Sequence, residues 1–95
     1  MQVKPEHDEI GQRYFLSMVA GEIDARESEV VVRYSLLDTS TINFTSTFTP
    51  TALRGQGLAR TVVEYALDDA ESKDLQIKAS CWYVEKILKE RREAS

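Results

Sequence analysis

The sharpest constraint on the fold is a change of hydrophobic period at Pro50. Before it, residues 42–49 alternate with period 2, which predicts a strand. After it, apolar residues recur at helical spacing from about Gly57 to Ser72, which predicts a helix with one apolar side. Proline cannot donate to a strand ladder, so it ends the strand. The expected strand faces are Ile42, Phe44, Ser46 and Phe48 on one side and Asn43, Thr45, Thr47 and Thr49 on the other.

Two further strand patterns precede this one. Residues 14–19 are an apolar run of strand length, and residues 30–37 are dominated by β-branched side chains. Residues 38–41 read Asp-Thr-Ser-Thr, a tight turn, because such side chains bond to nearby backbone. We therefore expect three antiparallel strands in a meander, with a polar connection at residues 21–28. Residues 1–12 are polar and form either a loose arm or a short edge piece.

The chain after the first helix repeats the change of pattern. Residues 75–80 alternate as a short strand, and residues 83–92 are helical with Val84, Ile87, Leu88 and Arg91 on one side. The predicted order is β-β-β-α-β-α, an α+β fold in which a right-handed βαβ crossover places the last two strands parallel. A length of 95 residues fits a single domain over residues 1–95.

The loop that joins the third strand to the first helix points to a ligand. It reads Arg54-Gly55-Gln56-Gly57-Leu58-Ala59-Arg60. Two glycines let the backbone turn tightly, and the start of the helix adds unpaired N–H groups with a partial positive charge. This arrangement suits a pyrophosphate, which Arg54 and Arg60 would neutralise from the flanks. From the glycines alone, a plain strand-to-helix turn is the favoured reading.

Composition excludes several kinds of function. The net charge of −4 argues weakly against a nucleic-acid partner, which needs an excess of Lys and Arg, and mildly favours a cationic acceptor. A charge of this size is more simply explained as the ordinary charge that keeps a protein soluble. One cysteine (Cys81) and one histidine (His7) do not make a metal-ligand cluster, so no metal site is expected. The sequence has no apolar run of membrane-spanning length and no secretory signal. We expect a cytoplasmic protein, in keeping with an unpaired cysteine.

The loop also carries a family resemblance. Residues 54–59 match the signature Q/R-x-x-G-x-G/A of the Gcn5-related N-acetyltransferase (GNAT) superfamily. Residues 47–88 resemble a small, single-domain subgroup in which a T-x-V-P turn, an R-G-x-G-x-A loop and a C-x-Y-V segment follow in this order. Here these motifs read Thr47-Phe48-Thr49-Pro50, Arg54 to Ala59, and Cys81-Trp82-Tyr83-Val84, with Thr49 in place of the more frequent valine.

The resemblance implies a compact GNAT-like fold that binds acetyl-coenzyme A. The backbone of Thr47, Phe48 and Thr49 would hold the pantetheine arm. The thioester would enter a gap between the third strand and residues 75–80. The loop would hold the pyrophosphate through Arg54, Gly55, Gln56, Gly57, Leu58, Ala59 and Arg60.

Two residues of the last motif are candidates for the chemistry. In the subgroup the cysteine lies beside the acetyl group and has been proposed as a catalytic residue or acetyl carrier, a role that falls here to Cys81. Packing is the equal alternative, since a free cysteine often behaves as a small hydrophobe. A pair between Cys81 and His7 is possible only through the fold. Tyr83 would donate a proton to the departing thiolate, although packing of the helix start also explains this tyrosine. Trp82 is expected to be exposed or half-buried. Glu64, Asp68 and Asp69 are expected to form a solvated helix face.

Three functions remain open at this stage. The first is an acetyl-CoA-dependent N-acetyltransferase acting on an unidentified amine. The second is a coenzyme A-binding module without catalysis, and the third is an interaction domain that has lost the ligand. Larger superfamily members have two early helices and two late strands that wall the acceptor pocket. This chain shows neither, so the acceptor site is open, supplied by a partner, or absent; the oligomeric state stays undetermined.

Overall fold

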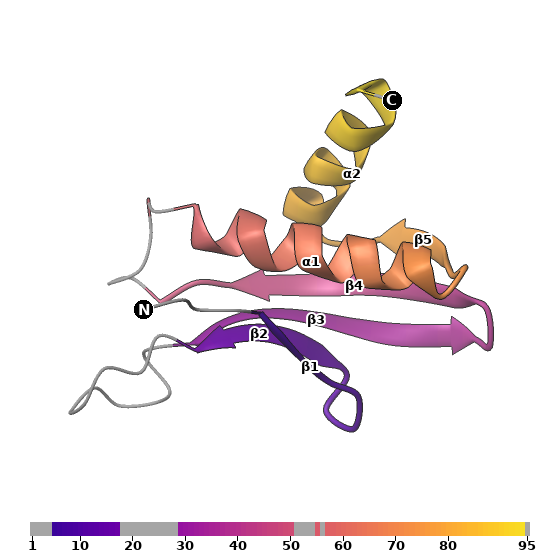
Figure 1. Ribbon diagram of the computed structural model, residues 1–95, viewed down its shortest axis with the longest axis horizontal. Coiled ribbons are helices and arrows are strands. Elements are labelled where there is room, and N and C mark those ends of the chain that lie inside the picture. The colour runs from indigo at the N-terminus through magenta and orange to yellow at the C-terminus, as the bar shows by residue number, and fades with distance from the viewer. Residues whose placement is uncertain (1–4, 18–28, 51–54, 56, 95) are drawn as a thin grey trace.

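The computed structural model describes residues 5–17, 29–50, 55 and 57–94. The expected meander and βαβ unit are both present, in an α+β fold of one sheet and two helices (Figure 1). The elements in chain order are β1 (Glu6–Asp8), β2 (Arg13–Ser17), β3 (Glu29–Asp38), β4 (Thr41–Phe48), α1 (Leu58–Ser72), β5 (Gln76–Ala79) and α2 (Trp82–Ala94).

The sheet follows the chain, in the order β1-β2-β3-β4-β5. Strands β1 to β4 pair antiparallel and β5 pairs parallel to β4, as the sequence predicts. The predicted order β-β-β-α-β-α omits β1, which is the short edge piece offered as one reading of residues 1–12. Strand β2 begins one residue before the expected start at Tyr14. The end of that prediction and the connection at residues 21–28 lie outside the described residues.

A β-bulge in β4 overturns the predicted faces of this strand. Arg33 pairs with Ser46 and Tyr34 with Phe44, so Thr45 is an extra residue on β4. Beyond a bulge, side chains exchange faces. Thr47 therefore lies opposite the buried Val32, on the helix side of the sheet. Phe48, expected beside Ile42 and Phe44, is instead 55% exposed.

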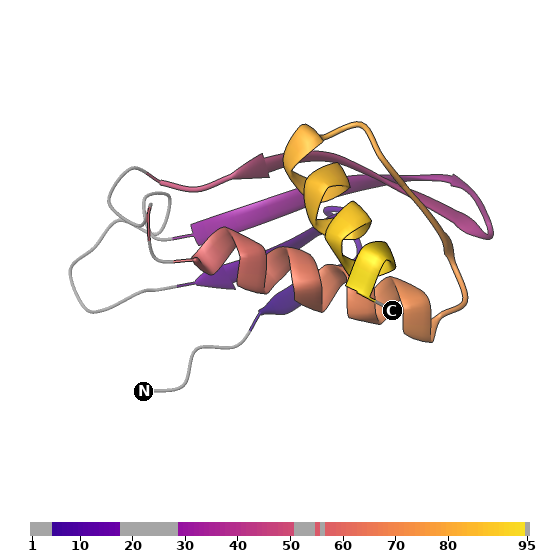
Figure 2. The ribbon, with the colours of Figure 1, turned by 90° about the horizontal axis from the view of Figure 1, so that it is seen from above.

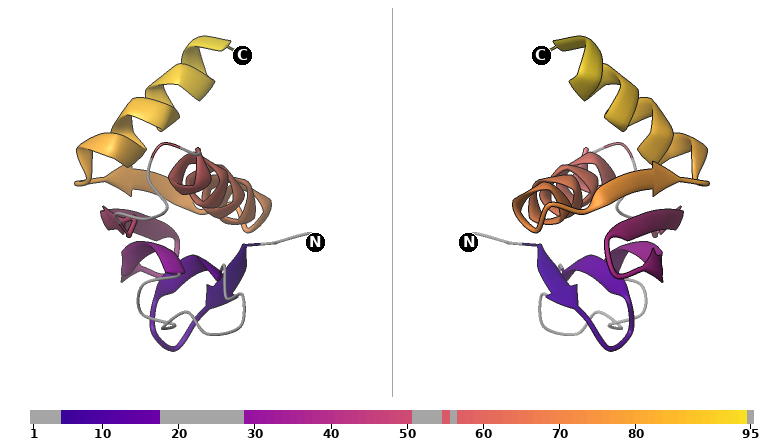
Figure 3. Two further views of the ribbon diagram at one scale, coloured as in Figure 1. Left: turned by 90° about the vertical axis from the view of Figure 1, so that its left-hand side faces the viewer. Right: turned by 90° about the vertical axis from the view of Figure 1, so that its right-hand side faces the viewer.

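Both helices pack on one face of the sheet, which curves around α1 in the end-on views (Figure 3). Helix α2 crosses α1, and its C-terminal part meets the second half of α1 (Figure 2), where the Arg91 guanidinium lies 2.7 Å from the Asp68 carboxylate. No described helix is long and apolar enough to span a bilayer. The core consists of Tyr14, Leu16, Val30, Val32, Tyr34, Ile42, Phe44, Val62, Val63, Ala66, Leu67, Ala70, Val84, Ile87 and Leu88.

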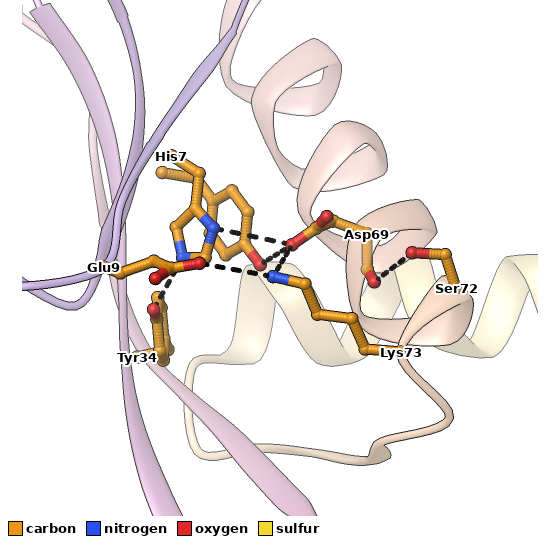
Figure 4. A network of polar contacts seen from close by, with 7 residues as sticks. His7, Glu9, Tyr34, Asp69, Ser72 and Lys73 are labelled. Atoms are coloured by element: carbon orange, nitrogen blue, oxygen red, sulfur yellow. Dashed lines mark hydrogen bonds and ion pairs between the residues drawn. The ribbon is translucent and has the colours of Figure 1, made fainter.

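A polar network centred on Asp69 ties the first strands to α1 (Figure 4). The Asp69 carboxylate accepts a 2.6 Å hydrogen bond from the Tyr14 hydroxyl and lies 2.9 Å from the Lys73 ammonium. It also lies 3.5 Å from Nδ1 of His7, whose ring stacks on Tyr14 and whose Nε2 is 2.6 Å from the Tyr34 hydroxyl. The prediction that Asp69 belongs to a solvated face is therefore wrong. Two of its partners, Tyr14 and His7, come from strands β2 and β1, and no helical periodicity reveals such contacts.

The network makes β1 sensitive to acid through His7. Desolvation and the nearby Lys73 ammonium lower the pKa of His7 below its ordinary value of 6.5, although Asp69 opposes them. A lowered folded-state pKa means that the stability from neutral His7 is complete above about pH 6.5 and is lost as the pH falls through the folded value.

We expect His7→Phe to keep the stacking on Tyr14 but to remove both the hydrogen bond to the Tyr34 hydroxyl and the titrating imidazole. Stability at pH 8 should fall by about 1 kcal/mol, the usual net worth of one hydrogen bond. Between pH 7 and pH 5 the variant should lose less stability than the wild type. Urea unfolding at several pH values measures this. Parallel stability curves for the two proteins would contradict it, since His7 is the one histidine in the sequence.

Candidate functional site

A cavity of about 500 Å³ opens where β4 ends and the two helices begin. It joins the end of β4, the glycine loop with the first turn of α1, and the first turn of α2. The described lining residues are Thr47, Phe48, Thr49, Gly55, Gly57, Leu58, Ala59, Cys81, Trp82 and Tyr83. All of these except Trp82 were predicted as site residues from the sequence.

The glycine loop forms one end of the cavity. Gly55 and Gly57 have φ angles of +82° and +74°, in the left-handed region that favours glycine. A Cβ atom built on either residue meets no atom of the described residues within 4 Å, chain neighbours apart, so the backbone here has room for a ligand. Gly57 is the N-cap of α1 and makes no side-chain cap hydrogen bond to the first N–H groups of the helix; the Thr61 hydroxyl donates to the Gly57 carbonyl instead. The first N–H groups of α1 are therefore available to an anion.

Strands β4 and β5 separate halfway along β4. Their pairing runs from Thr41 opposite Gln76 to Phe44 opposite Ala79. The N–H groups of Ser80 and Cys81 then both donate to the Phe44 carbonyl, and the chain turns into α2. Strand β4 continues to Phe48 without β5 beside it. Backbone groups at the end of β4 thus border the cavity, as an extended ligand that pairs with a strand edge requires.

Cys81 lies at the other end of the cavity, at the N-cap of α2, where its carbonyl accepts a bond from the Glu85 N–H at 3.0 Å. Its Sγ is 3.4 Å from the Thr47 hydroxyl oxygen. Burial raises the pKa of the thiol, but hydrogen bonds from the Thr47 hydroxyl and from the backbone N–H groups of Val84 and Tyr83 outweigh it. The pKa of Cys81 is therefore lowered. A thiolate is favoured at a helix N-terminus for the same reason.

Aromatic side chains surround the thiol end. Tyr83 is half-buried and lines the cavity, and Trp82, which meets it edge-on with ring centres 5.7 Å apart, is 72% exposed. The expectation that Trp82 is exposed is correct, but its place in the lining was missed. The available signal was its position between two predicted site residues, Cys81 and Tyr83.

Three further predictions for the site involve residues that are not among the described lining of the cavity. Arg54 and Gln56 lie outside the described residues. Arg60 does not line the cavity; its guanidinium pairs with Glu90 at 3.1 Å and with Glu64 at 3.9 Å. A Cys81–His7 pair is wrong, because His7 lies on β1, at the opposite edge of the sheet from β5, and bonds to Tyr34.

The described part of the cavity therefore joins a helix N-terminus suited to an anion, a strand edge that β5 does not cover, and a polarised thiol. None of its lining residues is a carboxylate or a histidine, and no described group of three or more His, Cys, Asp and Glu side chains is placed to hold a metal.

Comparison with known proteins identifies the family. The family model described as GCN5-related N-acetyl-transferase matches residues 19–95. Protein NATD1 of Mus musculus is 30% identical over 88 residues, which cover 93% of this chain and 76% of that protein. Protein NATD1 of Xenopus tropicalis is 26% identical, with 93% and 76% covered, and that of Homo sapiens is 26% identical, with 93% and 74% covered. The chain thus belongs to the GCN5-related N-acetyltransferase family.

Proposed function

We propose that this protein is an acetyl-CoA-dependent N-acetyltransferase that acts on an amine acceptor. The observation that carries the proposal is the cavity itself, which connects an uncapped helix N-terminus to a thiol with a lowered pKa. Family membership indicates which acetyl donor to expect, because acetyl-CoA use is general in this family.

Different lining residues suit the pyrophosphate, the pantetheine arm and the thioester of acetyl-CoA. The N–H groups of Gly57, Leu58 and Ala59 would bind the pyrophosphate. The backbone of residues 47–49, beyond the end of β5, would bind the pantetheine arm. This order brings the thioester toward Cys81 and Tyr83, at the far end of the cavity.

The chemistry requires a nucleophile, an electrophile and a proton path. The acetyl thioester supplies the electrophilic carbonyl, to which the amine nitrogen bonds as the carbon–sulfur bond breaks. Backbone N–H groups would polarise the carbonyl oxygen. The Tyr83 hydroxyl would give a proton to the departing coenzyme A thiolate. The Cys81 sulfur lines the same cavity and would, as a thiolate, accept the proton that the amine nitrogen loses.

A coenzyme A-binding module without catalysis is the second candidate. It is favoured by the lack of a carboxylate or histidine among the described lining residues, since such a group commonly serves as general base. Both candidates bind acetyl-CoA at the same site, and they differ only in whether the acetyl group is transferred to an acceptor.

Calorimetric titration with acetyl-CoA and with desulfo-CoA tests the shared part. Both should bind, and failure of both at millimolar concentration would exclude both candidates. Release of free coenzyme A in the presence of a panel of amines tests transfer. Mass spectrometry of protein incubated with acetyl-CoA should then show whether Cys81 carries an acetyl group, with Cys81→Ser as the control. Binding without release or adduct would establish the module instead.

A further inference from the structure

The contact between Thr47 and Cys81 joins two elements that are distant in sequence. Thr47 lies near the end of β4 and Cys81 precedes α2, 34 residues later, yet the hydroxyl oxygen and Sγ are 3.4 Å apart. The bulge at Thr45 produces this contact, because it turns Thr47 to the helix side of the sheet. Bulges beside functional sites commonly redirect a side chain in this way.

The surroundings of Sγ favour a negative charge. The backbone N–H groups of Val84, Tyr83 and Thr47 bond to the sulfur, and Tyr83 is the other titratable residue among the described lining. Glu85, in the first turn of α2, is exposed and opposes this charge. The hydroxyl of Thr47 is the one described side-chain hydrogen-bond partner of Sγ, and a hydroxyl rotor can donate to a thiolate where a methyl group cannot.

We propose that Thr47 is a positioning residue, whose hydroxyl holds the Cys81 sulfur as a thiolate directed into the cavity. Its importance for acetyl transfer rests on the proposed function, but the state of the thiol does not. The role differs from that of the Thr47 backbone, which borders the cavity whatever the side chain is. Removal of the hydroxyl alone should therefore change the reactivity of the sulfur and leave the strand edge intact.

The test is the pH profile of alkylation by iodoacetamide in the absence of coenzyme A. The chain has one cysteine, so the reaction reports on a single sulfur. Thr47→Val keeps the shape and the backbone N–H and removes the hydroxyl. Its profile should move to higher pH, with a rate at neutral pH roughly tenfold lower, since loss of a hydrogen bond to a charged group shifts an ionisation by about one unit. The rate at high pH should be nearly unchanged.

Two variants serve as controls. Thr47→Ser retains a hydroxyl and should restore the wild-type profile. Ser46→Ala removes an exposed hydroxyl on the same strand, on the face of the sheet opposite to Thr47, and should leave the profile in place. Circular dichroism of each variant checks that the fold is kept.

The proposal is overturned if Thr47→Val alkylates with the wild-type profile, or if Ser46→Ala shifts the profile equally. It is also overturned if the wild-type thiol titrates as an ordinary one. These results are independent of the proposed function. Loss of acetyl-CoA binding in the calorimetric titration would defeat the donor site while leaving the alkylation profile as evidence on Thr47.

Discussion

Replacing Gly57 by glutamate is expected to abolish acetyl-CoA binding. The new side chain would place a carboxylate at the N-terminus of α1, where the proposed site holds a pyrophosphate. Repulsion and the loss of charge-assisted hydrogen bonds should weaken binding by at least about a hundredfold, or roughly 2.8 kcal/mol. Calorimetric titration measures the change.

Gly57→Ala is the matched control for backbone strain. At a φ of +74° any L-residue is strained, by about 1–2 kcal/mol, so both variants should lose similar stability. The alanine Cβ meets no atom within 4 Å, and alanine carries no charge, so its binding should fall much less than that of the glutamate variant. Equal affinities for glutamate, alanine and wild-type proteins would remove the loop from the donor site.

The features that the sequence predicted well depend on local signals. The helix after Pro50 follows from the 3.6-residue period, and residues 30–37 form a strand because β-branched side chains dominate them. The place of Cys81 near the glycine loop followed from a family resemblance, since no spacing rule brings a residue at 81 to a loop at 57.

The features that were missed depend on tertiary contacts. The bulge at Thr45 has no signature, because the run of Thr and Ser from Thr45 to Thr47 presents a similar polar pattern in either register. Strand β1 has only three residues, Glu6, His7 and Asp8, none of them β-branched. Its pairing with β2 and the contacts of His7 hold it in the sheet. Because the bulge turns the Thr47 side chain toward Cys81, a prediction that lacks the bulge also lacks this contact in the site.

Replacing Asp69 by alanine should give the largest loss of stability among the changes considered. It leaves the hydroxyl of Tyr14, a residue only 1% exposed, without its 2.6 Å acceptor and removes the nearer of the two carboxylates that pair with Lys73. An orphaned buried donor and a broken, partly buried ion pair together cost about 3 kcal/mol. Glu64→Ala, which removes a carboxylate on the same helix that lies 3.9 Å from an exposed arginine, should cost under about 0.5 kcal/mol.

The pH dependence and a double variant separate this explanation from a general loss of helix stability. Desolvation raises the pKa of Asp69, but bonds from Tyr14 and Lys73 outweigh it and lower the pKa below the ordinary 3.8. The stability from Asp69 is thus complete above pH 3.8 and disappears as the pH falls through the folded value, so the difference between wild type and Asp69→Ala should narrow in acid. Adding Tyr14→Phe removes the orphaned hydroxyl and should recover part of the loss, because deleting both partners is milder than deleting one. Strictly additive losses in urea unfolding would show that the bond between these two residues does not stabilise the fold.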